Sequence, residues 1–155
     1  MKSSIKLFFL SVLFLSFSCG NDNKKEEAGY GKSETAKVPA SERIDLSNKG
    51  VGSITSVDLP LVVDEELAKQ GEEVYNKLCL ACHMVDKKFI GPSPKGILQR
   101  RSPEWVMNMI LNPEKMVKED PLAKDLLEEY NGSPMVGQNV TKDEARAILE
   151  YFRTL

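Results

Sequence analysis

The segment Cys79-Leu80-Ala81-Cys82-His83 places two thiols and an imidazole within a few residues, and His83 is the only histidine of the 155 residues. On a helical turn, side chains three and four residues apart lie on the same face. Both thiols can therefore bond to the edge of a porphyrin while the imidazole binds its iron, which is the chemistry of the C-x-x-C-H pattern. The pattern predicts one haem c, attached covalently through Cys79 and Cys82.

Two other uses of a C-x-x-C pair fit this sequence less well. A structural zinc site needs four ligands, but the third cysteine, Cys19, lies far upstream and no second histidine is present. A thioredoxin-like dithiol occurs beside alternating strands and helices, and the residues around Cys79 and Cys82 show no such alternation. The pair therefore favours haem attachment.

Residues 1–18 have the composition of an export signal. Lys2 and Lys6 precede an uncharged, mostly apolar run over residues 7–17, and Ser16 and Ser18 are small residues where a signal peptidase reads the chain. The apolar run is shorter than the roughly 20 residues of a membrane span. We therefore expect an exported protein on the periplasmic side of a bacterial membrane, where c-type haem is attached.

Cys19 directly follows this signal, and the stretch from Leu15 to Cys19 resembles a bacterial lipobox. Such a cysteine becomes the lipid-bearing N-terminus of the mature protein. Haem attachment uses the other two cysteines, so no disulfide partner remains for Cys19. We expect a lipid anchor at Cys19. The alternative is ordinary cleavage that leaves this thiol free.

Residues 19–63 are expected to form the lipidated N-terminus and a flexible tether. The segment up to Gly52 is rich in Lys, Glu, Ser, Gly and Asn and nearly lacks aromatic residues, a composition that buries too little apolar surface to offset ordering. Apolar residues between Ile54 and Leu61 are candidates for an extended lead-in to the domain. The formal net charge of -2 gives no reason to expect nucleic-acid binding.

Residues 64–155 predict a small all-α domain of about four to five helices. Apolar residues recur at helical spacing and no stretch shows sustained strand alternation. Helix starts are indicated by Asp64, by Ser102-Pro103, by Asp120-Pro121 and by Thr141 with Glu144 three residues later, while Asn112-Pro113 indicates a helix end. The chain is long enough for one such domain and a tail.

From Glu65 to Leu155 this order of elements resembles the class I monohaem cytochrome c family. The resemblance implies helices wrapped around one haem, with the first and last helices crossing closely. In that family a small residue on one helix meets aromatic residues on the other. Gly71 and Tyr75, facing Tyr151 and Phe152, would supply this contact here.

The iron needs a second axial ligand opposite His83, and no other histidine is available. Methionine is the next usual axial ligand and raises the reduction potential. Met135 lies in the loop before the last helix, where the family carries its ligand, and is the predicted choice. Met116, placed in a charged loop, is the runner-up.

Other residues are candidates for contacts around the haem. Through the family resemblance, the carbonyl of Pro92 is expected to accept the proton of the second nitrogen of His83. Arg100, Arg101 and Trp105 offer a basic pair and an indole donor near a helix start, and they are candidates to bond the haem propionates. Solvated surface positions are the alternative for the two arginines.

An iron with both axial positions filled predicts electron transfer rather than catalysis. We expect a one-electron carrier that exchanges electrons with redox protein partners, and Lys77, Lys87 and Lys88 are candidates to steer an acidic partner. The segment from Gly91 to Pro121 is similar to cytochromes that supply terminal reductases, and a terminal reductase or oxidase is the expected partner. A haem subunit of a larger oxidoreductase complex, or a haem enzyme or sensor with a labile ligand, are the alternatives.

Overall fold

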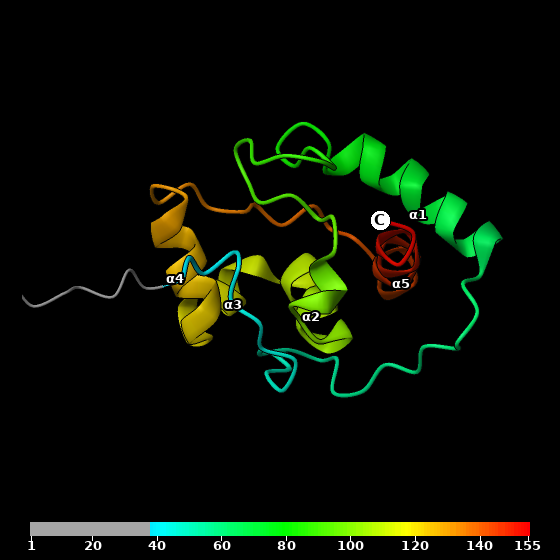
Figure 1. Cartoon of the computed structure of the whole chain (residues 1–155), viewed down its shortest axis with the longest axis horizontal. Coiled ribbons are helices and arrows are strands. Elements are labelled where there is room, and N and C mark those ends of the chain that lie inside the picture. Colours follow the sequence, from blue (N-terminus) through cyan, green and yellow to red (C-terminus); the bar gives the residue numbers. More distant parts are fainter. Residues whose placement is uncertain (1–37) are drawn as a thin grey trace, which may run out of the picture. The chain divides into compact units, whose positions relative to one another are not determined.

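A computed structural model describes residues 38–155. In this part the chain forms α1 (Glu65–Leu78), a 3-10 turn η1 (Ile97–Gln99), α2 (Pro103–Leu111), α3 (Pro113–Glu119), α4 (Pro121–Glu129) and α5 (Lys142–Phe152), as Figure 1 shows. Over these residues the only β-type pairing is an isolated bridge between Asp45 and Arg101. The predicted all-α fold is confirmed for these residues. The predicted signal peptide and Cys19 lie outside the described residues.

The helices begin where the sequence provides caps. The Asp64 side chain accepts a hydrogen bond from the Leu67 amide, and the Ser102 side chain accepts one from the Trp105 amide. Thr141 and Glu144 form the reciprocal capping box that starts α5. None of the helices in residues 38–155 is long and apolar enough to cross a membrane.

Helix α3 was not predicted. Asn112-Pro113 was interpreted only as the end of α2, but the Asn112 side chain also accepts a hydrogen bond from the Lys115 amide and so caps α3. Proline at the first helical position costs no hydrogen bond, which lets the same dipeptide end one helix and start the next. Met116 therefore lies on a helix and is fully buried, not in a charged loop.

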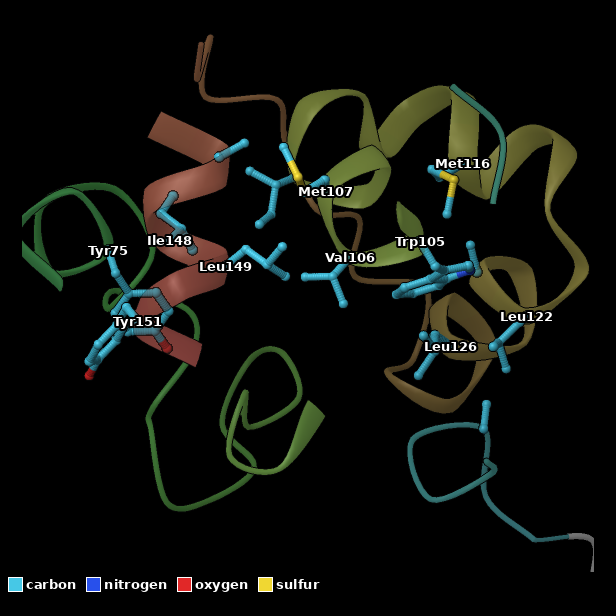
Figure 2. Packing of buried hydrophobic residues seen from close by; sticks show 14 of the residues in the cluster. Tyr75, Trp105, Val106, Met107, Met116, Leu122, Leu126, Ile148, Leu149 and Tyr151 are labelled. Carbon is cyan, nitrogen blue, oxygen red and sulfur yellow. The ribbon is translucent and has the colours of Figure 1, made fainter. Parts of the chain in front are cut away.

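Helices α1 and α5 contact each other closely, as the family resemblance implied, and they lie side by side in Figure 1. A Cβ atom built on Gly71 would lie 2.0 Å from the carbonyl oxygen of Ala147, so only glycine permits this approach. The ring of Tyr75 lies 5.4 Å from that of Tyr151 and 5.6 Å from that of Phe152. In Figure 2, Leu149 of α5 points toward Val106 of α2, and both residues belong to one core cluster.

Residues 38–63, here called the strap, are packed against the helical domain rather than forming a free tether. The strap contacts α4 through Ser41, α3 through Gly50 and α2 through Ile54. The packed part of the chain thus begins before the expected boundary at residue 64. The composition of the strap is polar, but its bonding partners are buried polar groups of the domain, such as Asn108 and Arg101.

The end of the strap contains the expected lead-in. Ile54, Val57 and Leu59 are partly buried against the core. Leu61, in contrast, is fully exposed. The strap therefore packs over most of its length and leaves the domain surface just before Asp64 starts α1.

Candidate haem-binding site

The Cys79–His83 segment forms a turn that continues from the end of α1. The amides of Cys82 and His83 both donate to the carbonyl of Cys79, at 3.0 and 2.9 Å. This turn places Cys82 and His83 on the same side as Cys79, as the motif predicted. Within the described part of the chain both thiols are free. Burial, followed by the neighbouring Cys82, raises the pKa of Cys79 to about 11, so its thiol is protonated at neutral pH.

These three side chains line one cavity of about 840 Å³, within the range of cofactor sites. Its wall is mostly apolar and comes from the 82–101 segment, from α2 and α4, and from the loop after α4. Residues from the strap also contribute. The apolar lining includes Leu78, Ile90, Ile97, Trp105, Met109, Leu126, Leu127 and Val136.

His83 is held in one orientation by its backbone neighbours. Its Nδ1 donates to the Pro92 carbonyl at 2.8 Å, which is the predicted hydrogen bond. Since a proline carbonyl can only accept, the proton is on Nδ1 and Nε2 is left to bind a metal. A Cβ atom on Gly91 would lie 2.3 Å from Cε1 of His83. The sequence places Gly91 beside Pro92 but predicts no role for it, because only this close approach in space explains a glycine there.

Met135 lies in the same cavity as His83, in the loop between α4 and α5. Met116, the runner-up, does not line this cavity: it is fully buried, and its sulfur accepts a hydrogen bond from the Val51 amide at 3.0 Å. Met109 of α2 does line it. Met135 as the axial ligand stays a prediction, with Met109 replacing Met116 as the alternative.

The candidate propionate contacts divide into two groups. The Trp105 indole N–H donates to Asp120, the cap of α4, at 3.1 Å. This donor is therefore already used, and Trp105 contributes only its ring to the wall of the cavity. Arg100 and Arg101 also line the cavity, and the Nε atoms of both are buried without an acceptor among the described residues. Arg101 is itself almost fully buried, and burial, followed by the charge of Arg100, lowers its pKa.

These features fit a haem. Two thiols and an oriented imidazole meet at one side of an apolar cavity. Two guanidinium groups with unsatisfied donors suit the two carboxylates of the porphyrin. The residues that would hold the group are therefore present in one place.

The sequence comparison decides the family. A family model described as cytochrome c matches residues 68–155. The chain belongs to the cytochrome c family. A cytochrome c carries covalently bound haem c, and Cys79 and Cys82 have the required spacing.

Solved structures of other cytochromes c are similar to this one. A cytochrome c from Rhodothermus marinus is 39% identical with a TM-score of 0.65, and the match covers 75% of this chain and 92% of that one. An engineered form of that protein, bound to a carbene intermediate, is 38% identical with a TM-score of 0.62, over 75% and 93% of the two chains.

A third structure is more distant. The cytochrome c domain of a Pseudomonas putida protein is 29% identical with a TM-score of 0.51, over 54% of this chain and 85% of that one. The comparison with curated proteins found no match. The matches support haem-based electron transfer as the activity of this cytochrome c.

Proposed function

We propose that this cytochrome c is an exported, lipid-anchored one-electron carrier that exchanges electrons with a respiratory reductase or oxidase. Haem iron supplies the one-electron chemistry when it is bound. The chain supplies an imidazole fixed by Gly91 and Pro92, two thiols for attachment, and a methionine sulfur in the same cavity. The presence of both His83 and Met135 at one cavity is the observation that carries the proposal.

The two ligands explain why transfer is favoured over catalysis. His83 and Met135 would hold the iron through an imidazole and a thioether, which would leave no coordination position for a substrate. The backbone contacts of His83 at Gly91 and Pro92 would limit the movement of its imidazole in either oxidation state of the iron. A small structural change on electron transfer favours a carrier over an enzyme or sensor.

Replacement of the sulfur tests the ligand assignment. We expect Met135→Ala to lose the weak near-infrared sulfur-to-iron band and to bind carbon monoxide rapidly when reduced. Met109→Ala is the matched control, because Met109 lines the same cavity from α2 and should leave the band unchanged. Persistence of the band in Met135→Ala, with loss in Met109→Ala, would reassign the ligand. Rapid carbon monoxide binding by the unaltered reduced protein would favour a sensor or enzyme.

A partner surface is proposed near the cavity. Leu80, Phe89, Ile90 and Val136 are exposed apolar residues, and Ile90 and Val136 also line the cavity. Lys87 is exposed beside them, whereas Lys88 stacks on the Tyr130 ring with its Nζ 4.2 Å from the centroid. An apolar patch with neighbouring positive charge suits an acidic redox partner.

Charge reversal tests this surface. We expect Lys77→Glu with Lys87→Glu to slow electron exchange with an acidic acceptor about tenfold at low salt and little at high salt. Lys115→Glu with Lys118→Glu, two exposed positions on α3, is the matched control. Equal slowing by both pairs would show that net charge alone matters. Co-purification of a reductase or oxidase from solubilised membranes tests the partner class and the alternative of a bound subunit.

The anchor has its own test. Intact-mass analysis of the membrane fraction should show acyl mass on a protein that begins at Cys19. Cys19→Ala should move the protein to the soluble fraction while leaving its absorption spectrum unchanged. A mature protein without acyl mass would remove the anchor and leave the carrier role intact.

A further inference from the structure

Part of the strap, residues 39–45, reaches the haem cavity although it lies outside the region matched by the cytochrome c family model. Pro39, Ser41 and Glu42 line the same cavity as His83 and Met135. We infer that residues 39–45 form one wall of the haem pocket and that Arg101 is the positioning residue that holds them there. This inference rests on haem occupying the cavity and is independent of the redox partner.

Arg101 binds the backbone of this wall directly. Its Nη1 donates to the carbonyls of Arg43 and Arg100, and its Nη2 donates to the carbonyl of Ala40 at 2.5 Å. The side chain is 1% exposed. The Nε of Arg101 has no acceptor among the described residues, so its Nη atoms depend on these carbonyls, because a buried guanidinium without acceptors is strongly destabilising. The carbonyls of Ala40 and Arg43 are therefore required partners, which fixes the path of the wall.

A second set of contacts attaches the wall to α4. The Ser41 amide and hydroxyl both donate to the Glu129 carboxylate, at 2.8 and 2.5 Å. The Arg43 guanidinium pairs with Asp125 at 2.6 Å. Glu129 also lines the cavity, so this attachment occurs at the cavity rim.

One apolar contact and one backbone contact complete the attachment. The Ala40 side chain is 4% exposed and belongs to the core cluster. The Asp45 amide donates to the Arg100 carbonyl at 2.9 Å. The wall is thus bound to the 100–101 segment on one side and to α4 on the other.

A wall at this place would limit water at the haem. The oxidised iron carries one more positive charge than the reduced iron, and water stabilises the more charged form. Opening the wall is therefore expected to lower the reduction potential, since burial is one of the properties by which a protein sets it.

The test uses the full-length holoprotein and a neutral substitution, so that no new charge confuses the potential. Ala40→Gln places a longer polar side chain in a buried site and should release the wall. We expect the Asp45 amide to exchange its hydrogen about tenfold faster or more, and the reduction potential to fall. Ile44→Gln is the matched control, because Ile44 lies within the wall but is 72% exposed. It should change neither quantity.

A second, milder variant covers the case in which Ala40→Gln fails to fold. Ser41→Ala with Arg43→Ala and Asp125→Ala removes both side-chain contacts to α4 without changing the net charge, and it leaves the helical core unchanged. Faster exchange together with a lower potential in either variant supports the inference. Faster exchange at an unchanged potential overturns it, because the wall would then not shield the haem. Unchanged exchange in each variant that folds also overturns it, since the contacts named here would not be the ones that hold the wall.

Discussion

Two parts of the helical domain are held together by different kinds of contact. Where α1 crosses α5, the contacts are close and apolar: the Gly71 backbone lies against Ala147, and Tyr75 packs on aromatic rings of α5. Where the strap passes α2 and α4, buried polar side chains provide many of the contacts, chiefly those of Arg101 and Asp120.

The difference predicts which kind of substitution should disrupt each part. A close crossing depends on volume, because packed backbones have nowhere to move. A buried polar contact depends on donors and acceptors, because a group that loses its partner still carries the cost of desolvation. Added volume should therefore disrupt the crossing, whereas loss of an acceptor should disrupt the strap side.

Gly71→Ala should have the largest effect on stability. The added methyl group would meet the Ala147 carbonyl at 2.0 Å, a backbone atom that cannot rotate away. Alanine in a helix favours folding by about 1 kcal/mol over glycine, but overpacking of this kind costs more. We expect a net loss of about 2 to 3 kcal/mol in the free energy of unfolding, measured by urea denaturation of the holoprotein. Gly137→Ala has open space around it and should change stability little. Equal midpoints for the two variants would contradict the steric account.

Asp120→Ala tests the strap side. The buried Asp120 carboxylate accepts hydrogen bonds from the Trp105 indole at 3.1 Å, the Ala123 amide at 2.8 Å and the Asn48 side chain at 2.7 Å. Its loss leaves buried donors unpaired and removes the cap of α4, at a cost of about 2 kcal/mol.

The control for Asp120→Ala is a helix cap without buried partners. Thr141→Ala removes the exposed cap of α5 and should cost about 1 kcal/mol. Thermal unfolding of the two variants gives the comparison. A loss in Asp120→Ala no larger than that in Thr141→Ala would mean that the contacts to Trp105 and Asn48 add nothing.

The sequence predicted the elements that depend on neighbouring residues. The caps at Asp64, Ser102, Asp120 and Thr141 are local signals, and each starts a helix. The turn at Cys79 and the hydrogen bond of His83 to Pro92 also involve residues close in sequence. Local spacing was therefore sufficient for the haem-attachment turn and for four of the helix starts.

Most of the features that were missed depend on residues far apart in sequence, and helix α3 with its local Asn112 cap is the exception. The polar composition of the strap suggested a free tether, because no pattern within it shows that Arg101 and Asn108 are its buried partners. Residue type alone made the Trp105 indole N–H a candidate donor to a haem propionate, but in the structure it donates to Asp120, fifteen positions later in the chain. Met116 is buried against the strap at Gly50. Each of these outcomes follows from tertiary contacts that single-sequence patterns do not encode.

The smallest of the expected effects concerns Glu150, which connects the two parts. Its fully buried carboxylate accepts from the Asp64 amide at 2.9 Å and pairs with Arg146 at 2.5 Å and with Arg153, which in turn donates to the carbonyl of Pro60 at the end of the strap. Burial by itself would raise the pKa of Glu150. The Asp64 amide and the two arginines outweigh it and hold that pKa below its ordinary value of 4.5.

The lowered pKa of Glu150 determines how the free energy of unfolding changes with pH. The unfolded chain binds a proton at Glu150 more readily than the folded chain, so stability rises with pH. The contribution is complete above about pH 4.5 and is lost as pH falls through the lower pKa of the folded state. We expect Glu150→Gln to lose about 1 kcal/mol at pH 7, because both arginines are partly exposed and water can solvate them.

Urea denaturation at pH 7 and at pH 3 separates the charge from the shape of this side chain. The glutamine of Glu150→Gln keeps an oxygen for the Asp64 amide but lacks the charge. The difference in free energy of unfolding between the variant and the unaltered protein should therefore be smaller at pH 3 than at pH 7. The exposed Glu128→Gln is the control and should show no such difference at either pH. A difference of equal size at pH 3 and pH 7 would assign the role of Glu150 to packing. The contact between the strap and the helices at Glu150 would then depend on side-chain volume, as the α1–α5 crossing does. It would not depend on hydrogen bonds and charge, as the other strap contacts do.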